Sequence, residues 1–370
     1  MKRKPQKKKR NRVRNRSWEE AHETSFTHDR AKHRSAQSKF SDNAQSNRER
    51  DRLPEDFTPN ALVIAHSKKW AFVMQDGEER LCLIDEQLEA TDQTLLASGD
   101  RVYIEQEGEE FIVRGVAPRR SYLARLAGPH ARVKTQVLAA NVDLLIIVAS
   151  AARPPFRPGL IDRYLITAEL GNVTPVLCVN KVDLVDTLPE ELQRYRELGL
   201  EVFTTSCEHG EGVAELKARL EGQVSVLAGH SGVGKSSLLN VMDPELDLHT
   251  RSISESTQRG KHTTTAARYY EIGNDIRIID TPGIRSLGLW GVSPEEVAYY
   301  FPEIAALALQ CRFRNCTHTH EPDCAVQNAA DNGQLPLARY KSYLRIRASL
   351  ESDTGMTPGR LTAKYQGHRL

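Results

Sequence analysis

The spacing of apolar residues divides the chain into regions with different predicted structures. Between residues 60 and 117, apolar and polar positions alternate with a period of two, which predicts short strands separated by turns. The predicted strands are Ala61–Ile64, Trp70–Met74, Arg80–Ile84, Asp100–Ile104 and Phe111–Arg114. Strands this short and this closely spaced are typical of a five-stranded OB-type β-barrel, a fold that often binds single-stranded nucleic acid.

The predicted barrel carries charged and aromatic side chains that suit such a ligand. His66, Lys68, Lys69 and Trp70 combine positive charge with a ring on which a base could stack. The aromatic residues could instead belong to the barrel core. We expect a core position for Phe72, whereas for Trp70 both positions stay open.

From residue 142 onward, apolar runs of strand length alternate with amphipathic stretches of helix length. The predicted strands cover residues 142–149, 175–179, 201–204, 223–228, 268–272 and 276–280, and the predicted helices cover 160–170, 189–198, 212–220 and 237–242. This alternation predicts a doubly wound α/β domain with a parallel sheet. We interpret the basic stretch 118–136 as a connector between the barrel and this domain.

The C-terminal part is predicted to be mostly helical. Ser293, Pro294 and Glu296 match a capping box with proline at the first helical position, which predicts a helix over 295–300. A last helix is expected over 336–350. We therefore expect a basic disordered arm (1–58), an OB-type barrel (59–117), an α/β domain (118–291), a helical module (292–350) and a flexible tail (351–370).

The charge of the chain is distributed unevenly. Residues 1–52 contain 17 Lys and Arg against 7 Asp and Glu, whereas the net charge of the whole chain is only +2. So polar an arm cannot bury enough apolar surface to fold alone. Its charge suggests a polyanionic partner, although a solubilising tail or a nuclear localisation signal would have the same composition.

The apolar runs give no sign of a membrane protein. The longest run, Leu144–Ala152, is too short to span a bilayer, and the basic N-terminus lacks the apolar core of a signal peptide. We therefore expect a cytoplasmic protein that has no membrane partner and is a monomer.

Residues 229–236 read Gly-His-Ser-Gly-Val-Gly-Lys-Ser and match the phosphate-binding pattern G-x-x-x-x-G-K-[ST]. A predicted strand enters this loop and a predicted helix leaves it, as the motif requires. Lys235 is expected to reach the β- and γ-phosphates and to take part in catalysis, and the Ser236 hydroxyl is expected to bind Mg²⁺. The predicted nucleotide contacts of the loop are Gly229, His230, Ser231, Gly232, Val233, Gly234, Lys235, Ser236 and Ser237.

A second motif, Asn180-Lys181-Val182-Asp183, follows a predicted buried strand. The Asp183 carboxylate can accept hydrogen bonds from the N1–H and the 2-amino group of guanine, whereas adenine would leave it unpaired. Asn180 and Lys181 are expected to brace the loop and cover the base. Thr205, Ser206 and Cys207 follow the next predicted strand, where their backbone N–H groups could contact the base. These residues predict a guanine nucleotide, GTP or GDP.

A third motif, Asp280-Thr281-Pro282-Gly283, ends another predicted strand. Asp280 fits the acidic residue that holds Mg²⁺ through water, and the Gly283 N–H can meet the γ-phosphate. The preceding loop contains Thr264 and Thr265, and we favour Thr264 as the threonine that completes the Mg²⁺ shell, with Thr265 as the next candidate.

Three cysteines and a histidine cluster near the C-terminus as Cys311-x₄-Cys316-x-His318-x₅-Cys324. Three thiolates and one imidazole make a closed tetrahedral site for one structural Zn²⁺ ion, which would fold the module and not catalyse. His320 is a rival ligand because it lies close by in the sequence. Free or disulfide-bonded cysteines are the alternative without a metal.

The order of the motifs is unusual. Ordinary GTPases place the phosphate loop first and N-K-x-D near the end, whereas this chain has N-K-V-D first and D-T-P-G last. The sequence therefore predicts a circularly permuted sheet, whose second switch continues directly into the C-terminal module.

The chain resembles the ribosome small-subunit-dependent GTPase A family over about 60–350. The resemblance rests on the permuted order of the motifs, on Gly260 and His262–Thr265, on the five-stranded barrel before them and on the Cys/His module after them. The resemblance implies a GTPase in late maturation of the bacterial small ribosomal subunit, stimulated by that subunit. It implies the small subunit, its rRNA and other assembly factors as partners. A nucleotide-gated RNA-binding scaffold with incidental turnover, or a factor acting on other RNA, are the alternatives.

One position departs from ordinary GTPases and affects the mechanism. Gly283 is followed by Ile284, where many GTPases carry the glutamine that orients the attacking water. An aliphatic side chain cannot do this, so a polar group must come from elsewhere in the chain or from a partner. His262 is the candidate, as a base or as a water-orienting group. Its alternative role is that of an exposed loop histidine that contacts rRNA.

Overall fold

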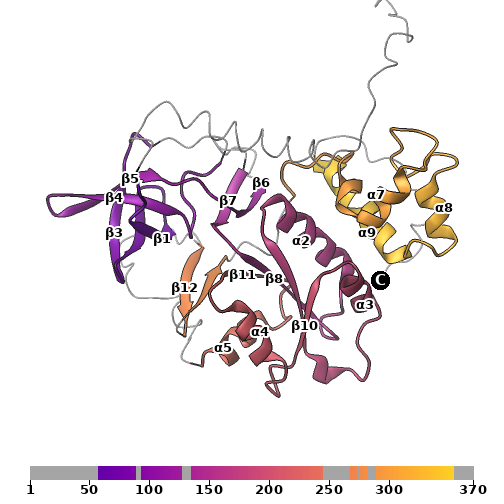
Figure 1. Ribbon diagram of the computed structural model, residues 1–370, viewed down its shortest axis with the longest axis horizontal. Helices are drawn as coiled ribbons and strands as arrows, with labels where there is room; N and C mark the ends of the chain where they lie inside the picture. Colours follow the sequence, from indigo (N-terminus) through magenta and orange to yellow (C-terminus); the bar gives the residue numbers. More distant parts are fainter. Residues whose placement is uncertain are drawn as a thin grey trace, which may run out of the picture. The chain divides into compact units, whose positions relative to one another are not determined.

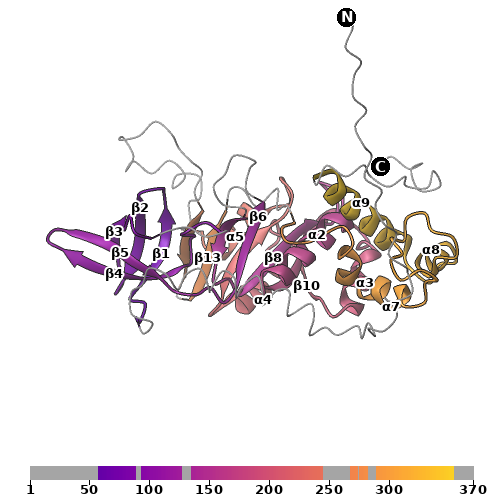
Figure 2. The same ribbon diagram turned by 90° about the horizontal axis from the view of Figure 1, so that it is seen from above.

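The computed structural model describes residues 57–88, 93–126, 135–244, 267–273, 275–281 and 289–353. Its N-terminal strands are β1 (Ala61–His66), β2 (Trp70–Gln75), β3 (Glu78–Ile84), β4 (Arg101–Glu107) and β5 (Glu110–Val116). They close into a barrel in the order β1-β2-β3-β5-β4, in which β1 also pairs with β4 (Figure 2). The prediction of a five-stranded barrel is confirmed.

The alternation of side chains along β2 decides which residues fill the barrel. Ala71 and Val73 of β2 are completely buried, as are Val63 of β1 and Cys82 of β3. Their neighbours in β2, Trp70 and Phe72, point outward. Phe72 is 37% exposed, so its expected core position is wrong. The neighbouring Trp70 is 43% exposed on the same outer face.

The α/β domain contains a six-stranded sheet with the order β10-β9-β8-β11-β13-β12 (Figure 1). The strands are β8 (Leu144–Ser150), β9 (Thr174–Asn180), β10 (Glu201–Thr205), β11 (Val224–Ala228), β12 (Arg268–Ile272) and β13 (Ile276–Asp280). All neighbours are parallel except β12, which is antiparallel to β13. The strand that enters the phosphate loop, β11, is therefore central, although β8 to β10 precede it in sequence.

Helices cover both faces of this sheet. They are α2 (Pro158–Leu170), α3 (Glu191–Glu197), α4 (Val213–Leu220) and α5 (Lys235–Met242), with a short 3-10 helix, η3 (Val182–Leu184), after β9. Leu145 and Ile147 of β8 share one hydrophobic cluster with α2 and α3, whereas Leu144 and Ile146 share another with α4 and α5. The period-two side-chain direction of a buried strand thus creates both layers, as predicted for a doubly wound domain.

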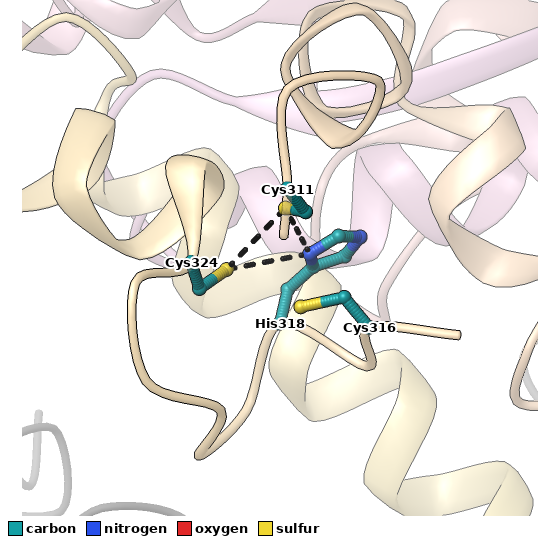
Figure 3. A group of neighbouring side chains, drawn as sticks. All are labelled: Cys311, Cys316, His318 and Cys324. Atoms are coloured by element: carbon teal, nitrogen blue, oxygen red, sulfur yellow. Dashed lines mark hydrogen bonds between the residues drawn. The ribbon is translucent and has the colours of Figure 1, made fainter. Parts of the chain in front are cut away.

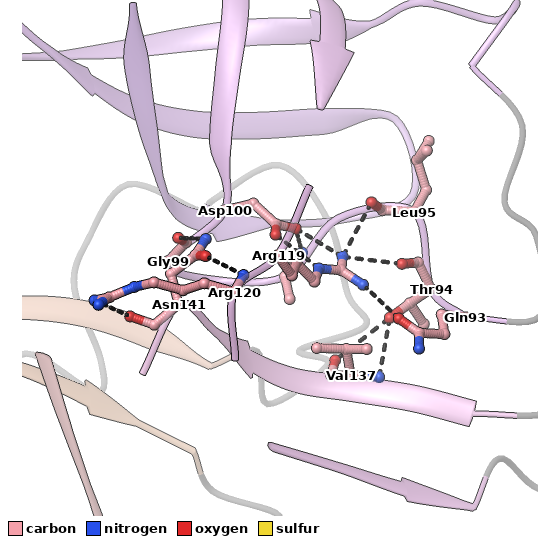
Figure 4. A network of polar contacts seen from close by, with 10 residues as sticks. Gln93, Thr94, Leu95, Gly99, Asp100, Arg119, Arg120, Val137 and Asn141 are labelled. Atoms are coloured by element: carbon pink, nitrogen blue, oxygen red, sulfur yellow. Dashed lines mark hydrogen bonds and ion pairs between the residues drawn. The ribbon is translucent and has the colours of Figure 1, made fainter. Parts of the chain in front are cut away.

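The stretch interpreted as a basic connector contains a hairpin. Strands β6 (Tyr122–Leu126) and β7 (Thr135–Ala140) pair antiparallel. Before the hairpin, the Arg119 guanidinium forms a bidentate ion pair with Asp100, with both N–O distances 2.7 Å, and Figure 4 shows its further bonds to Gln93, Thr94 and Leu95. The interpretation of residues 118–136 as a basic connector is therefore incomplete, because they include β6 and the start of β7.

The C-terminal module is helical, and the helix expected over 336–350 is confirmed as α9 (Leu337–Asp353), whereas the helix expected over 295–300 differs. The other elements of the module are η6 (Val297–Tyr300), α7 (Pro302–Ala308) and α8 (Ala325–Asp331). The capping bond from the Ser293 N–H to Glu296 forms at 2.8 Å, yet a turn and a 3-10 helix replace the helix expected over 295–300. Among the helices of the described ranges, none has the length and apolar character needed to cross a membrane.

Candidate functional site

The carboxyl ends of the parallel strands meet at one edge of the sheet. Five strands end there, at Ser150, Asn180, Thr205, Ala228 and Asp280. Ligands of open α/β sheets bind outside this edge, where the order of the strands reverses. The sheet therefore brings together the phosphate loop, N-K-V-D, Ser206 and the start of D-T-P-G, although they are far apart in sequence.

Glycine is required in the phosphate loop because the backbone approaches other atoms closely. Gly229 has a φ of 149°, and a Cβ there would lie 2.2 Å from the Val148 carbonyl oxygen. Gly234 has a φ of 100°, and a Cβ there would lie 2.2 Å from Asn180 Nδ2. At these angles only glycine is unstrained. The resulting loop at the N-terminus of α5 suits a phosphate group.

The lysine of the loop lies over its own backbone. Lys235 Nζ donates to the carbonyl oxygens of Gly229 at 2.8 Å and His230 at 3.0 Å. The ammonium group is thereby held at the mouth of the loop, where its charge can meet the phosphates of a nucleotide.

Asn180 connects the two nucleotide motifs. Its Nδ2 donates to the Val233 carbonyl at 3.0 Å, and its Oδ1 accepts hydrogen bonds from Thr205 Oγ1 at 3.1 Å and from the Cys207 thiol at 3.4 Å. Burial raises the pKa of the Cys207 thiol, which keeps its proton available for this bond. Asn180 is 1% exposed and braces the loop, as expected from the sequence.

Lys181 also reaches the phosphate loop. Its backbone is left-handed, with a φ of 64°, and its Nζ donates to the carbonyl oxygens of Gly232 at 2.6 Å and Arg153 at 2.7 Å. The aliphatic part of this side chain can therefore form one wall of a base pocket.

Asp183 is held by the neighbouring strand end. The Ser206 hydroxyl donates to Asp183 Oδ1 at 2.6 Å, and Ser206 Oγ in turn accepts a hydrogen bond from the His209 N–H at 3.3 Å. Ser206 is completely buried, whereas the Asp183 carboxylate is open to a ligand. An oriented carboxylate beside the phosphate loop can read a guanine edge.

Some predicted site residues lie outside the described residues. These are His262, Thr264, Thr265 and Gly283. Asp280, at the end of β13, is described and exposed, and it lies beside β11 at the edge of the phosphate loop. With Ser236, it offers oxygen ligands of the kind that Mg²⁺ prefers.

Three cysteines and one histidine of the C-terminal module come together as the zinc motif predicts. The ligand atoms of Cys311, Cys316, His318 and Cys324 all lie within 4.8 Å of one another (Figure 3). Cys311 Sγ is 3.8 Å from Cys324 Sγ, and His318 Nδ1 is 3.5 Å and 3.4 Å from these two sulfur atoms. A tetrahedral zinc ion with ordinary bond lengths separates two sulfur ligands by about 3.8 Å and a sulfur from a nitrogen ligand by about 3.5 Å. Cys311, His318 and Cys324 match these separations, and Cys316 completes the group of four.

The surroundings of the cluster agree with this chemistry. Burial lowers the pKa of His318 to about 4, so the imidazole is neutral and can donate its lone pair. Burial also raises the pKa of Cys316 and Cys324, and a bound cation would supply the charge that favours their thiolates. His320 is exposed and lies outside the group of four, so the structure favours His318 over this rival.

Sequence reasoning placed Thr205 near the base through its backbone but missed its side-chain role, and it missed the Arg153 carbonyl altogether. Thr205 fixes the Asn180 side chain, and the Arg153 carbonyl holds Lys181. The only available signal for Thr205 was its place at the end of a predicted strand. The Arg153 contact could not be predicted from the sequence, because Lys181 binds the backbone carbonyl of the loop after β8 and no particular side chain is needed there.

Comparisons with known proteins agree with this site. The RsgA GTPase family model matches residues 116–290. A relative from Gemmatimonas aurantiaca, named small ribosomal subunit biogenesis GTPase RsgA, is 38% identical over 302 residues, which are 79% of this chain and 97% of the relative.

Two solved structures have a similar fold. The crystal structure of YjeQ from Thermotoga maritima has a TM-score of 0.59 and 30% identity and covers 78% of this chain and 97% of its own. The crystal structure of YloQ, described as a circularly permuted GTPase, has a TM-score of 0.57 and 26% identity, with coverage of 82% and 98%. This chain therefore belongs to the RsgA GTPase family and is a GTP hydrolase with a circularly permuted sheet.

Proposed function

We propose that this GTPase acts in small ribosomal subunit biogenesis as a late checkpoint. It binds the nearly mature small subunit and its rRNA in the GTP form, the subunit stimulates hydrolysis, and hydrolysis drives release. The name of the Gemmatimonas relative supports the small subunit as the partner. Other assembly factors of that subunit are further partners, and the protein acts as a monomer in the cytoplasm.

The observation that carries this proposal is the anchoring of the chain after D-T-P-G. Leu289 and Trp290 are 2% and 3% exposed. Leu289 packs into the hydrophobic core of the C-terminal module, and Trp290 packs on the hairpin with its ring 6.0 Å from that of Tyr122. A change near the γ-phosphate would therefore reach both elements through a short length of chain.

The proposed residue roles follow from the positions at the strand edge. Asp183 reads guanine with support from Ser206 and Cys207, and Lys235 stabilises the phosphates. Ser236 and Asp280 hold Mg²⁺ with Thr264 or Thr265, and the Gly283 N–H meets the γ-phosphate. Cys311, Cys316, His318 and Cys324 hold one structural Zn²⁺ ion.

We also propose the five segments expected from the sequence as the domains. The borders at 117/118 and 291/292 fall between elements, and α9 continues to Asp353, past the border at 350. The barrel is proposed to bind rRNA with its outer face. The exposed Trp70 and Phe72 there could stack on bases, beside Lys68 and Lys69.

The test is GTP turnover measured with purified small subunits, large subunits and naked RNA. We expect small subunits alone to raise turnover, by about 100-fold if they complete an unfinished catalytic site. The Lys235→Ala variant serves as the blank. Equal turnover with all three additions would favour the nucleotide-gated scaffold, and stimulation by naked RNA would favour a factor acting on other RNA.

A second prediction concerns the group that orients the water. We propose His262 for this role, because Ile284 cannot perform it. The His262→Ala variant should lose about 100-fold of subunit-stimulated turnover, while its GTP affinity stays close to that of the parent. Single-turnover kinetics with small subunits measures the first quantity and equilibrium nucleotide binding the second. Unchanged stimulated turnover would remove His262 from the mechanism.

A further inference from the structure

The loop that carries His318 has a backbone that requires support. His318 has a φ of 57°, in the left-handed region that residues other than glycine rarely adopt. Its side chain is 3% exposed and points at the cysteine sulfur atoms (Figure 3). Such a conformation persists only where the surrounding structure imposes it.

The Glu321 carboxylate provides this support from within the loop. Its Oε1 accepts hydrogen bonds from the Thr317 N–H at 2.7 Å and the Thr317 hydroxyl at 2.5 Å. Its Oε2 accepts the Thr319 N–H at 3.1 Å and the His320 N–H at 3.3 Å. These four donors lie on both sides of His318 in the sequence. Because a carboxylate has about four lone-pair sites, they use all of the hydrogen-bond acceptor capacity of Glu321.

Two tyrosines of α9 hold the other side of the same loop. The Tyr340 hydroxyl donates to the His318 carbonyl at 2.7 Å, and the Tyr343 hydroxyl donates to the Thr317 carbonyl at 2.8 Å. Both tyrosines are at most 1% exposed. The backbone on either side of the imidazole is therefore fixed by side chains that do not themselves belong to the group of four ligands.

We infer that Glu321 is a positioning residue for the metal centre, which builds the His318 loop before the ion arrives. The inference rests on the proposed zinc site. Glu321 acts on affinity through the geometry of His318, because its oxygen atoms are engaged by N–H and O–H donors of the loop. Partners of this kind change metal affinity by about 10- to 100-fold when they are removed.

The test is the Zn²⁺ dissociation constant of the full chain, measured by competition with a chromogenic chelator. Glu321→Ala should weaken zinc binding by about 10- to 100-fold. Glu321→Gln should give a smaller loss, because its amide keeps one acceptor oxygen and turns an NH₂ group toward two N–H donors. Thr317→Val, which removes one donor, should also give a smaller loss.

Asp323→Asn is the matched control. Asp323 carries the same charge two residues further on, but its side chain is 72% exposed, and among the described residues its ion pair is with the exposed Arg312 at 3.3 Å. Its zinc affinity should equal that of the parent. GDP affinity, which reports on the separate nucleotide site, serves as the check of folding. If Glu321→Ala fails this check, the Gln and Val variants decide.

Cobalt substitution distinguishes positioning from ligation. Once saturated with Co²⁺, the Glu321 variants should show the visible d–d absorption of the parent, since three cysteines and His318 still bind. A changed spectrum at saturation would overturn the positioning role, and so would parental zinc affinity in Glu321→Ala or Glu321→Gln. A parent chain that binds no zinc would instead reject the metal site itself.

Discussion

At the scale of single residues, we propose that base specificity depends on the Asp183 carboxylate. Ser206 donates to one of its oxygen atoms at 2.6 Å, so the carboxylate is oriented before a nucleotide binds. An ionised carboxylate only accepts hydrogen bonds, whereas the guanine edge only donates at N1 and the 2-amino group. In this proposal, specificity for guanine follows from the Asp183 side chain and from the Ser206 hydroxyl that orients it.

The Asp183→Asn variant should change the base preference from guanine to xanthine. Its amide NH₂ would face the donors of guanine, which costs about 100-fold in GDP affinity. Xanthine has a carbonyl in place of the 2-amino group and could accept from the same NH₂, so affinity for XDP should rise. Equilibrium binding of fluorescent GDP and XDP analogues measures both effects.

The control for this exchange lies on the same loop. Asp186 is exposed, and Asp186→Asn removes the same charge without touching the base. It should leave both affinities unchanged. An Asp183→Asn variant that still prefers GDP over XDP would show that another group reads the base.

At the scale of elements, the strands were predicted well because their side-chain period is set locally. Alternating positions in β2 and continuous apolar runs in β8 and β9 are visible in the sequence and match the observed strands. The site motifs were predictable for the same reason, since each follows the end of a strand. The hydrogen bonds between the motifs could not be predicted, because Asn180 and Val233 come together only through the order of the strands in the sheet.

The hairpin β6–β7 shows where local patterns fail. Thr135, Val137, Ala139 and Ala140 are all buried, so β7 shows no clean alternation of apolar and polar residues. Basic residues nearby favoured the interpretation as a connector. The burial comes from tertiary partners, among them Ala97 and Trp290, which a window of sequence cannot show.

The helix expected over 295–300 forms only in part, as the 3-10 helix η6 after a turn, for a different reason. The capping bond that predicted it is present, but Pro302 follows closely, and proline disfavours a helical conformation in the residue before it. Phe301 is accordingly extended, with φ −119° and ψ 91°, and α7 starts afresh at Pro302. The short helices α7 and α8 are each seven residues long and depend on packing, so their periodicity alone could not predict them.

At the scale of the whole molecule, the segment 93–100 between β3 and β4 joins the barrel to the α/β domain. Ser98 donates to the Ala267 carbonyl at 2.7 Å, just before β12. Gly99, with a φ of 92°, accepts from Asn141 Nδ2 at 2.8 Å, and a Cβ on it would lie 2.1 Å from the Ala140 carbonyl oxygen. The ion pair of Asp100 with Arg119 fixes the shape of this segment (Figure 4).

This ion pair is buried, so removing Arg119 should destabilise the protein far more than removing the arginine of the neighbouring, more exposed pair. The side chains of Arg119 and Asp100 are 3% and 0% exposed, and Arg119→Met would leave a buried carboxylate without its cation. We expect a loss of about 3 to 5 kcal/mol in the free energy of unfolding. Arg120→Met should cost at most about 1 kcal/mol, because Arg120 pairs with Asp143 while its side chain is 55% exposed.

The combined variant separates the charge from the packing. In Asp100→Leu with Arg119→Met no charge remains buried, so the double variant should be more stable than the sum of the two single losses predicts. Urea denaturation followed by circular dichroism, with all variants at the same ionic strength, gives the four free energies that the comparison needs. If Arg119→Met unfolds at the same urea concentration as Arg120→Met, the pair does not hold the barrel segment in place, and the bonds of Ser98 and Gly99 must suffice.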